Sequence, residues 1–187
     1  MSLSLEIFIL GILSEGHSHP YEIKKTILKN LSDEENLKIK DGTLYYRFDT
    51  LLKKELIQKV EVVREANRPD KTMYAITDKG REVLKEDIYK SFKNFSNIKI
   101  VYSSILFLKH VDLQIVMFLV QEAIEKVKKQ REQLINESAA EWWESRETEI
   151  DYGKKEDYHF VKNHFNEAID FNLAGLEKFL AFLKQKQ

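Results

Sequence analysis

The spacing of hydrophobic residues in the first half of the chain predicts a series of short helices. Apolar side chains recur at helical spacing from Leu3 to Leu13, and the polar run that ends at Gly16 stops this pattern. A second helix is expected to begin at Pro20, because proline suits the first helical position, where its missing N–H has no partner. A third helix is expected with Asp41 as its cap, and its buried side carries Leu44, Phe48, Leu51 and Leu52.

The pattern changes to a period of two at Ile57, which predicts a β-hairpin. Apolar residues interleave with polar ones from Ile57 to Arg64, turn-forming residues follow at 67–70, and a second short strand is expected over 72–76. Thr77 is placed to cap a further helix that runs toward Phe92. Three helices, a hairpin and a fourth helix are the layout of a winged helix-turn-helix, a module that binds DNA in some proteins and only other proteins in others.

The second half of the chain predicts two long helices with apolar stripes. The first stripe comprises Leu113, Val116, Val120, Ile124, Val127 and Leu134, and the second comprises Tyr158, Val161, Phe165, Ile169, Leu176, Phe179 and Leu183. The second helix is apolar over so broad an arc that it must be covered on two sides, and one chain offers too little covering surface. We therefore predict a homodimer formed through Val116, Val120, Ile124, Val127, Phe165, Phe171, Leu176 and Phe179.

The predicted fold is mainly α with a small β-hairpin. Residues 1–96 would form a winged helix-turn-helix DNA-binding domain, and residues 97–187 a coiled-coil-like helical region for dimerisation and effector binding. The length of 187 residues allows one domain or two small ones, and 43% hydrophobic residues exclude a disordered chain. The absence of cysteine excludes disulfides, thiolate metal sites and a cysteine nucleophile. No apolar run is long enough for a membrane span, so a soluble cytoplasmic protein is expected.

Positive charge is concentrated in the predicted DNA-binding region. Between Asn36 and Arg81 there are eleven Lys and Arg against seven Asp and Glu, a net charge of +4, while the whole chain carries −1. Such a local excess suits contact with phosphates. The basic residues nearest the predicted third helix and the hairpin are Lys38, Lys40, Arg64, Arg68 and Lys71.

The third predicted helix has a polar side opposite its apolar one. In a helix-turn-helix the N-terminal part of this helix meets base edges in the major groove. Thr43 could bond a phosphate or a base, Tyr46 could contact a phosphate or a thymine methyl, and Asp49 could accept from cytosine. An ordinary solvated helix face is the alternative. The predicted DNA contacts on this helix are Thr43, Tyr45, Tyr46, Arg47, Thr50 and Lys53.

Several stretches resemble the PadR family of bacterial transcriptional regulators. They are the run from Ile9 to Gly16, the His19-Pro20-Tyr21-Glu22-Ile23 segment, the Asp41-Gly42-Thr43-Leu44-Tyr45 opening of the third helix, Lys54-Glu55-Leu56-Ile57, and the wing from Arg68 to Gly80. The resemblance implies a winged-helix regulator with a C-terminal helical dimerisation region. It also implies a family in which some members sense phenolic acids or drugs.

Other features suggest chemistry less specifically. Trp142 and Trp143 could bind a small aromatic effector, or they could pack at the dimer interface, since adjacent helical residues face different directions. The pairs His17/His19 and His159/His164 lack the i, i+4 spacing of helical metal ligands. No catalytic triad, phosphate loop or paired carboxylate motif is present. We therefore expect no metal, no cofactor and no enzymatic activity.

The sequence thus predicts a dimeric, sequence-specific transcriptional regulator, and the leading interpretation is that it is a repressor. Two third helices would enter successive major grooves about 34 Å apart on a palindromic operator of double-stranded DNA. The alternative is a winged-helix protein-interaction module without DNA binding, which Asp49 and Asp70 on the predicted DNA surface would favour.

Overall fold

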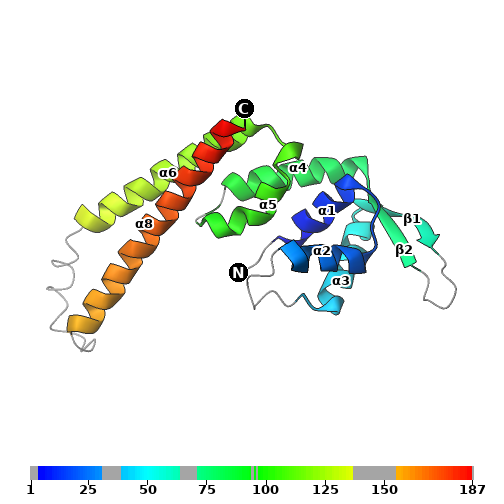
Figure 1. Cartoon of the computed structure of the whole chain (residues 1–187), viewed down its shortest axis with the longest axis horizontal. Helices are drawn as coiled ribbons and strands as arrows, with labels where there is room; N and C mark the ends of the chain where they lie inside the picture. The colour runs from blue at the N-terminus through cyan, green and yellow to red at the C-terminus, as the bar shows by residue number, and fades with distance from the viewer. Residues whose placement is uncertain are drawn as a thin grey trace. The chain divides into compact units, whose positions relative to one another are not determined.

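The computed structural model of the chain describes residues 4–30, 39–63, 71–93, 95, 97–136 and 155–186 (Figure 1). The chain divides into two units. The N-terminal unit comprises residues 1–91 and 100–111, and the C-terminal unit comprises residues 92–99 and 112–187. The sequence pattern predicts a single boundary after residue 96, whereas in the structure residues 92–99 belong to the C-terminal unit and residues 100–111 to the N-terminal unit. The assignment of DNA binding to one half and dimerisation to the other stays a prediction.

The first three helices form where the apolar spacing predicts them. They are α1 (Leu5–Glu15), α2 (Pro20–Asn30) and α3 (Asp41–Lys53). Helix α1 is buried on most sides, because Ile7, Phe8, Ile9, Leu10 and Leu13 are all nearly inaccessible to solvent. Phe107 packs edge-on against Phe8 with ring centroids 6.0 Å apart, and its ring also faces Gly11. The centre of the N-terminal unit is therefore α1.

The start of α3 differs in one respect from the prediction. Asp41 was expected to cap the helix, but it is the first helical residue, and Lys40 occupies the cap position without a side-chain hydrogen bond. The Asp41 carboxylate instead accepts a hydrogen bond from the Lys24 ammonium of α2 at 2.6 Å. A cationic partner on the neighbouring helix thus takes the carboxylate away from the backbone N–H groups that a cap would satisfy.

The predicted hairpin is confirmed, with strands β1 (Ile57–Val63) and β2 (Lys71–Ile76) paired antiparallel. The register shifts between Lys59 and Glu61, so that Val60 is an extra residue in β1. This β-bulge explains why the apolar residues of β1 do not alternate strictly. On its other edge β2 forms a bridge to Ser18, with both backbone bonds between Ser18 and Tyr74 close to 3 Å.

Helix α4 (Asp78–Lys93) begins directly after β2, and Thr77 caps it as predicted. The Thr77 hydroxyl accepts from the Gly80 N–H at 3.0 Å and donates to the Glu55 carbonyl at 2.8 Å. The Thr77 N–H donates to the Leu56 carbonyl oxygen at 3.0 Å. A Cβ at position 80 would lie only 2.1 Å from that same oxygen, so the first turn of α4 requires glycine there.

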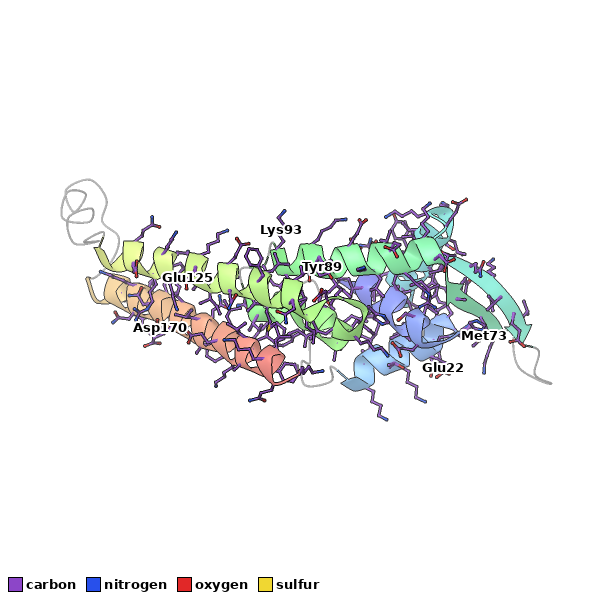
Figure 2. The ribbon with its side chains drawn as sticks, turned by 90° about the horizontal axis from the view of Figure 1, so that it is seen from above. Glu22, Met73, Tyr89, Lys93, Glu125 and Asp170 are labelled. Atoms are coloured by element: carbon purple, nitrogen blue, oxygen red, sulfur yellow. The ribbon has the colours of Figure 1, made fainter. Side chains whose placement is uncertain are left out.

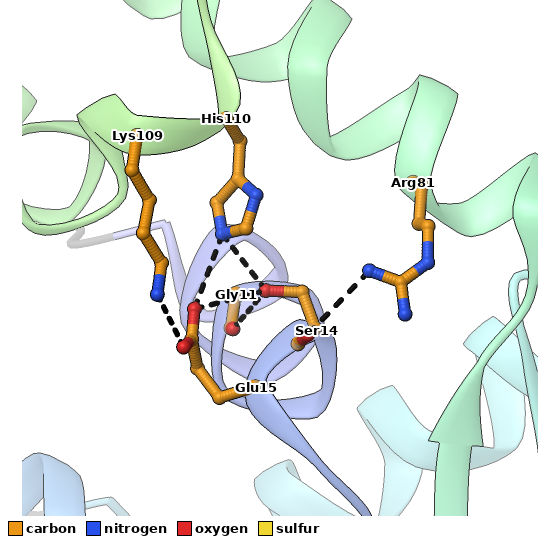
Figure 3. Close-up of polar contacts among 6 residues, drawn as sticks. All are labelled: Gly11, Ser14, Glu15, Arg81, Lys109 and His110. Carbon is orange, nitrogen blue, oxygen red and sulfur yellow. Dashed lines mark hydrogen bonds and ion pairs between the residues drawn. The ribbon is translucent and has the colours of Figure 1, made fainter.

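The end of α1 is tied to a short helical segment near residue 110. This region contains η1 (Ile98–Val101), α5 (Tyr102–Leu106) and η2 (Leu108–His110). Figure 3 shows the polar contacts: Glu15 pairs with Lys109, and His110 Nε2 lies 3.3 Å from Glu15 Oε1 and 2.9 Å from Ser14 Oγ. Arg81 of α4 donates to the Ser14 carbonyl at 3.5 Å. The hydrogen bond from Lys109 lowers the pKa of Glu15, with a smaller contribution from His110.

The C-terminal unit contains the two predicted long helices, α6 (Leu113–Asn136) and α8 (Lys155–Gln185). They lie side by side and antiparallel, as Figure 2 shows along the stretch that holds Glu125 and Asp170. Arg131 of α6 donates to both carboxylate oxygens of Asp170 of α8, so an ion pair links the two helices. Phe92 stacks on Phe179 with ring centroids 5.8 Å apart.

Candidate nucleic-acid interface

One side of α3 is buried and the other is open to solvent. Leu44, Phe48 and Leu51 are almost completely buried, as the apolar spacing predicts. On the opposite side Thr43, Asp49 and Lys53 are exposed, and the Tyr46 side chain keeps 66% of its surface exposed. The Tyr45 side chain is about half exposed. The structure therefore gathers these residues on one accessible helix face.

Two of the residues predicted to contact DNA are engaged within the protein. Arg47 Nη1 donates to Glu6 Oε1 of α1 at 3.0 Å, so its guanidinium links α3 to α1. The Thr50 hydroxyl donates to the Tyr46 carbonyl of the preceding turn at 2.9 Å. These contacts hold both side chains against their own chain, and a role for either in DNA contact requires that the bond be shared or exchanged.

The hairpin is fixed to α3 through Tyr74. The rings of Tyr74 and Phe48 meet edge-on with centroids 5.0 Å apart. Burial raises the pKa of the Tyr74 hydroxyl, and the carboxylate of Asp49 and the phenol of Tyr45 act in the same direction. The contact with Phe48 places Tyr74 of β2 against α3.

The start of α2 contacts the same region. His19 Nδ1 accepts from the Tyr21 N–H at 3.1 Å, so the neutral imidazole caps α2. Burial lowers the pKa of His19, the positive charge of Lys71 lowers it further, and Glu22 opposes them. Lys71, the first residue of β2, is half-buried. Tyr74 of β2 forms backbone hydrogen bonds with Ser18, just before α2, and its ring packs on Phe48 of α3, so the start of α2, strand β2 and α3 meet in one part of the N-terminal unit.

Of the remaining residues predicted to contact DNA or an effector, one is described by the structure and the others are not. Lys40 is exposed at the start of α3. Lys38, Arg64 and Arg68, together with Trp142 and Trp143, lie outside the described residues. Across the described ranges, no cluster of His, Cys, Asp and Glu could hold a metal ion. Within the same ranges, no helix has both the length and the apolar character that crossing a membrane requires.

Most of the residues predicted for dimerisation are buried within a single chain. The six are Val116, Val120, Ile124, Val127, Leu176 and Phe179. Phe171 keeps 72% of its surface exposed, and Phe165 is also exposed. The same chain covers these six side chains, that of Phe179 in part through Phe92 of α4, and of the eight predicted residues Phe165 and Phe171 are exposed. Whether they contact a second copy stays a prediction.

Sequence reasoning did not select two residues of α2. Lys24 forms the ion pair with Asp41, and Tyr21 is exposed in the first turn of α2. The ion pair joins residues on two different helices, so no spacing rule within one helix indicates it. Tyr21 belongs to a stretch noted for its family resemblance, which was the available signal.

Comparison with known proteins matches the first half of the chain to one family. The model of the PadR-like family of transcriptional regulators matches residues 9–86. A transcriptional regulator from Clostridium thermocellum is 32% identical, with 46% of this chain and 80% of that chain covered and a TM-score of 0.41. A PadR-like regulator from Bacillus cereus is 28% identical, with 47% and 80% covered and a TM-score of 0.38.

A third structure covers nearly the whole chain. Bacillus subtilis PadR in complex with operator DNA is 18% identical, with 98% of this chain and 99% of that chain covered and a TM-score of 0.44. No curated protein matches the chain. The matched residues 9–86 begin within α1 and end within α4, so they include α2, α3 and both strands of the hairpin. On the family match and the identity to the Clostridium thermocellum regulator, the chain belongs to the PadR-like family of transcriptional regulators.

Proposed function

We propose that this regulator binds a specific operator in double-stranded DNA through α3, as a homodimer that represses transcription in the cytoplasm. The observation that carries the proposal is the accessible face of α3, where Thr43, Tyr46 and Lys53 are exposed opposite a fully buried apolar side. Hydroxyl and ammonium groups on such a face can bond base edges and phosphates in a major groove. Membership of the PadR-like family supports this role, and Bacillus subtilis PadR has been crystallised with operator DNA.

The homodimer is proposed to form through the apolar residues of α8 that one chain leaves uncovered. Phe160, Val161, Phe165 and Phe171 are all more than half exposed. Large aromatic side chains exposed in such number on one helix are typical of an association surface. A second copy of the chain is the occupant we propose, because a palindromic operator requires two reading helices related by two-fold symmetry.

Selection of bound duplexes from a random pool tests the proposed function. The expected result is a palindromic consensus whose half-sites are separated by about one helical turn, with affinity that falls as salt concentration rises. Tyr46→Ala and Lys53→Ala should weaken binding, and the first should also relax the consensus if Tyr46 contacts a base. Equal affinity for selected and random duplexes would instead support the protein-interaction alternative.

Light scattering of the purified chain tests the dimer. A mass of twice 22.2 kDa is expected, and Phe165→Ser combined with Phe171→Ser should shift the protein toward the monomer. Leu28→Ser is a matched control, because Leu28 is an exposed apolar residue of α2 in the other unit. A monomeric wild-type chain at micromolar concentration would contradict the proposal.

An aromatic effector is the remaining element of the proposal. Bacillus subtilis PadR has been crystallised with p-coumaric acid. Trp142 and Trp143 are the only two tryptophans of this chain, so its tryptophan fluorescence reports on that pair alone. We expect p-coumaric acid to change the fluorescence and to lower operator affinity in the same concentration range, and unchanged fluorescence at millimolar concentration would argue against this site.

A further inference from the structure

The ion pair between Lys24 and Asp41 lies at the N-terminal end of the helix that we propose reads DNA. Lys24 Nζ donates to Asp41 Oδ1 at 2.6 Å. The two side chains are unequally placed, because that of Lys24 is only 22% exposed and that of Asp41 is 71% exposed. The carboxylate is therefore the outward member of the pair, and the ammonium approaches it from the protein side.

The surroundings of Asp41 are open to an approaching ligand. Gly42 has nothing within 4 Å of the position a Cβ would take, and Thr43 is exposed. Lys40 is exposed on the other side, and its side chain makes no cap. In a helix-turn-helix this end of the helix enters the groove between two phosphate backbones. A carboxylate there without a cationic partner would repel the phosphates.

We propose that Lys24 is a positioning residue for DNA binding, which neutralises Asp41 so that the N-terminal end of α3 can approach the phosphate backbone. The inference rests on the proposed DNA-binding function. Asp41 lies in the first turn of α3, where the helix dipole stabilises a negative charge. The positive charge of Lys24 offsets the repulsion between that carboxylate and the DNA phosphates. Lys24 thereby acts through Asp41 and needs no contact of its own with a base.

This arrangement predicts opposite effects for the two partners. Lys24→Met leaves the Asp41 carboxylate unpaired, and operator affinity should fall by about 3- to 10-fold at 0.1 M salt. Asp41→Asn removes the repulsion and leaves Lys24 available to phosphate, so affinity should stay equal or rise by about 3-fold. The double variant should return to within about 2-fold of wild type, and Lys24→Arg should bind like wild type. A purely structural ion pair predicts that both single variants weaken binding together.

The experiment is a fluorescence-anisotropy titration of the full-length chain with selected operator duplex at two salt concentrations. Lys25→Met is the matched control, because it removes one exposed cation from the next position of α2, and Asp41→Asn should not restore its affinity. Melting temperatures measured in parallel separate lost folding from lost binding.

Each outcome bears on one of the two proposals. If wild type binds no duplex, the proposed function fails. If wild type binds but Lys24→Met binds equally well, the inference fails alone. It also fails if Asp41→Asn weakens binding, a result that stays informative even where Lys24→Met does not fold.

Discussion

Gly80→Ala is expected to destabilise the winged helix, although alanine has a higher helix propensity than glycine. The new Cβ would lie 2.1 Å from the Leu56 carbonyl oxygen and 2.8 Å from Cγ1 of Ile76. Contacts of a Cβ below 3.0 Å essentially never occur, so the first turn of α4 must move away from Leu56 by about 0.9 Å, the difference between 3.0 and 2.1 Å. The obstructing atom belongs to the backbone and cannot rotate away as a side chain can.

The expected free-energy change follows from three contributions. Overpacking of this kind costs about 1–3 kcal/mol. Stretching the Thr77 N–H bond to the Leu56 carbonyl costs about 0.5–1.5 kcal/mol. The better helix propensity of alanine returns about 1 kcal/mol. The free energy of unfolding should therefore fall by about 2 kcal/mol, which for a chain of this length lowers the melting temperature by about 4–8 °C.

Urea unfolding followed by far-ultraviolet circular dichroism measures this change, and Gly42→Ala is the control. Gly42 also lies in the first turn of a helix, but nothing stands within 4 Å of its missing Cβ. The control should be neutral or more stable by up to about 1 kcal/mol. If Gly80→Ala behaves like Gly42→Ala, the close approach of α4 to Leu56 is wrong.

Four further changes test other parts of the structure. Because the pKa of His19 is lowered in the folded chain, the unfolded chain binds the proton more readily. The free energy of unfolding should therefore rise with pH from the folded pKa up to about 6.5. His19→Asn keeps a helix cap but does not titrate, so urea unfolding at several pH values should show a smaller rise. The lowered pKa of Glu15 contributes stability that is lost as pH falls below 4.5 through the folded pKa, so acid titrations of Glu15→Gln should show a slightly shallower loss. Leu176→Ala should cost about 2–4 kcal/mol at any protein concentration, because Leu176 is buried within one chain. Phe171→Ala should instead weaken the proposed dimer and so lower the melting temperature most at low protein concentration, and a large loss of monomer stability would contradict its exposure.

The sequence pattern was sufficient for the elements whose signal is local. Pro20 marks the start of α2, Thr77 caps α4, and the change of period at Ile57 marks the hairpin, because each signal depends on residues within one turn or one strand pair. The exposed face of α3 followed from the same local reasoning, since burial of Leu44 and Phe48 fixes which side of the helix faces solvent.

Features that depend on contacts between elements could not be predicted in this way. Asp41 was expected to cap α3, but its carboxylate bonds Lys24 on another helix. Contact of Arg47 with DNA stays a prediction, but its ion pair with Glu6 of α1 was not foreseen. The apolar stripe through Leu176 was attributed to a second chain because sequence periodicity shows that a face is covered and does not show which helix covers it.

The bridge between Ser18 and Tyr74 has a consequence for how such regulators can diversify. Its two hydrogen bonds join main-chain groups only, so no particular side chain is required at position 18. The base of the hairpin is thus secured independently of the amino acids further along its strands. Substitutions in the rest of the hairpin can therefore change the surface that it presents without removing this attachment.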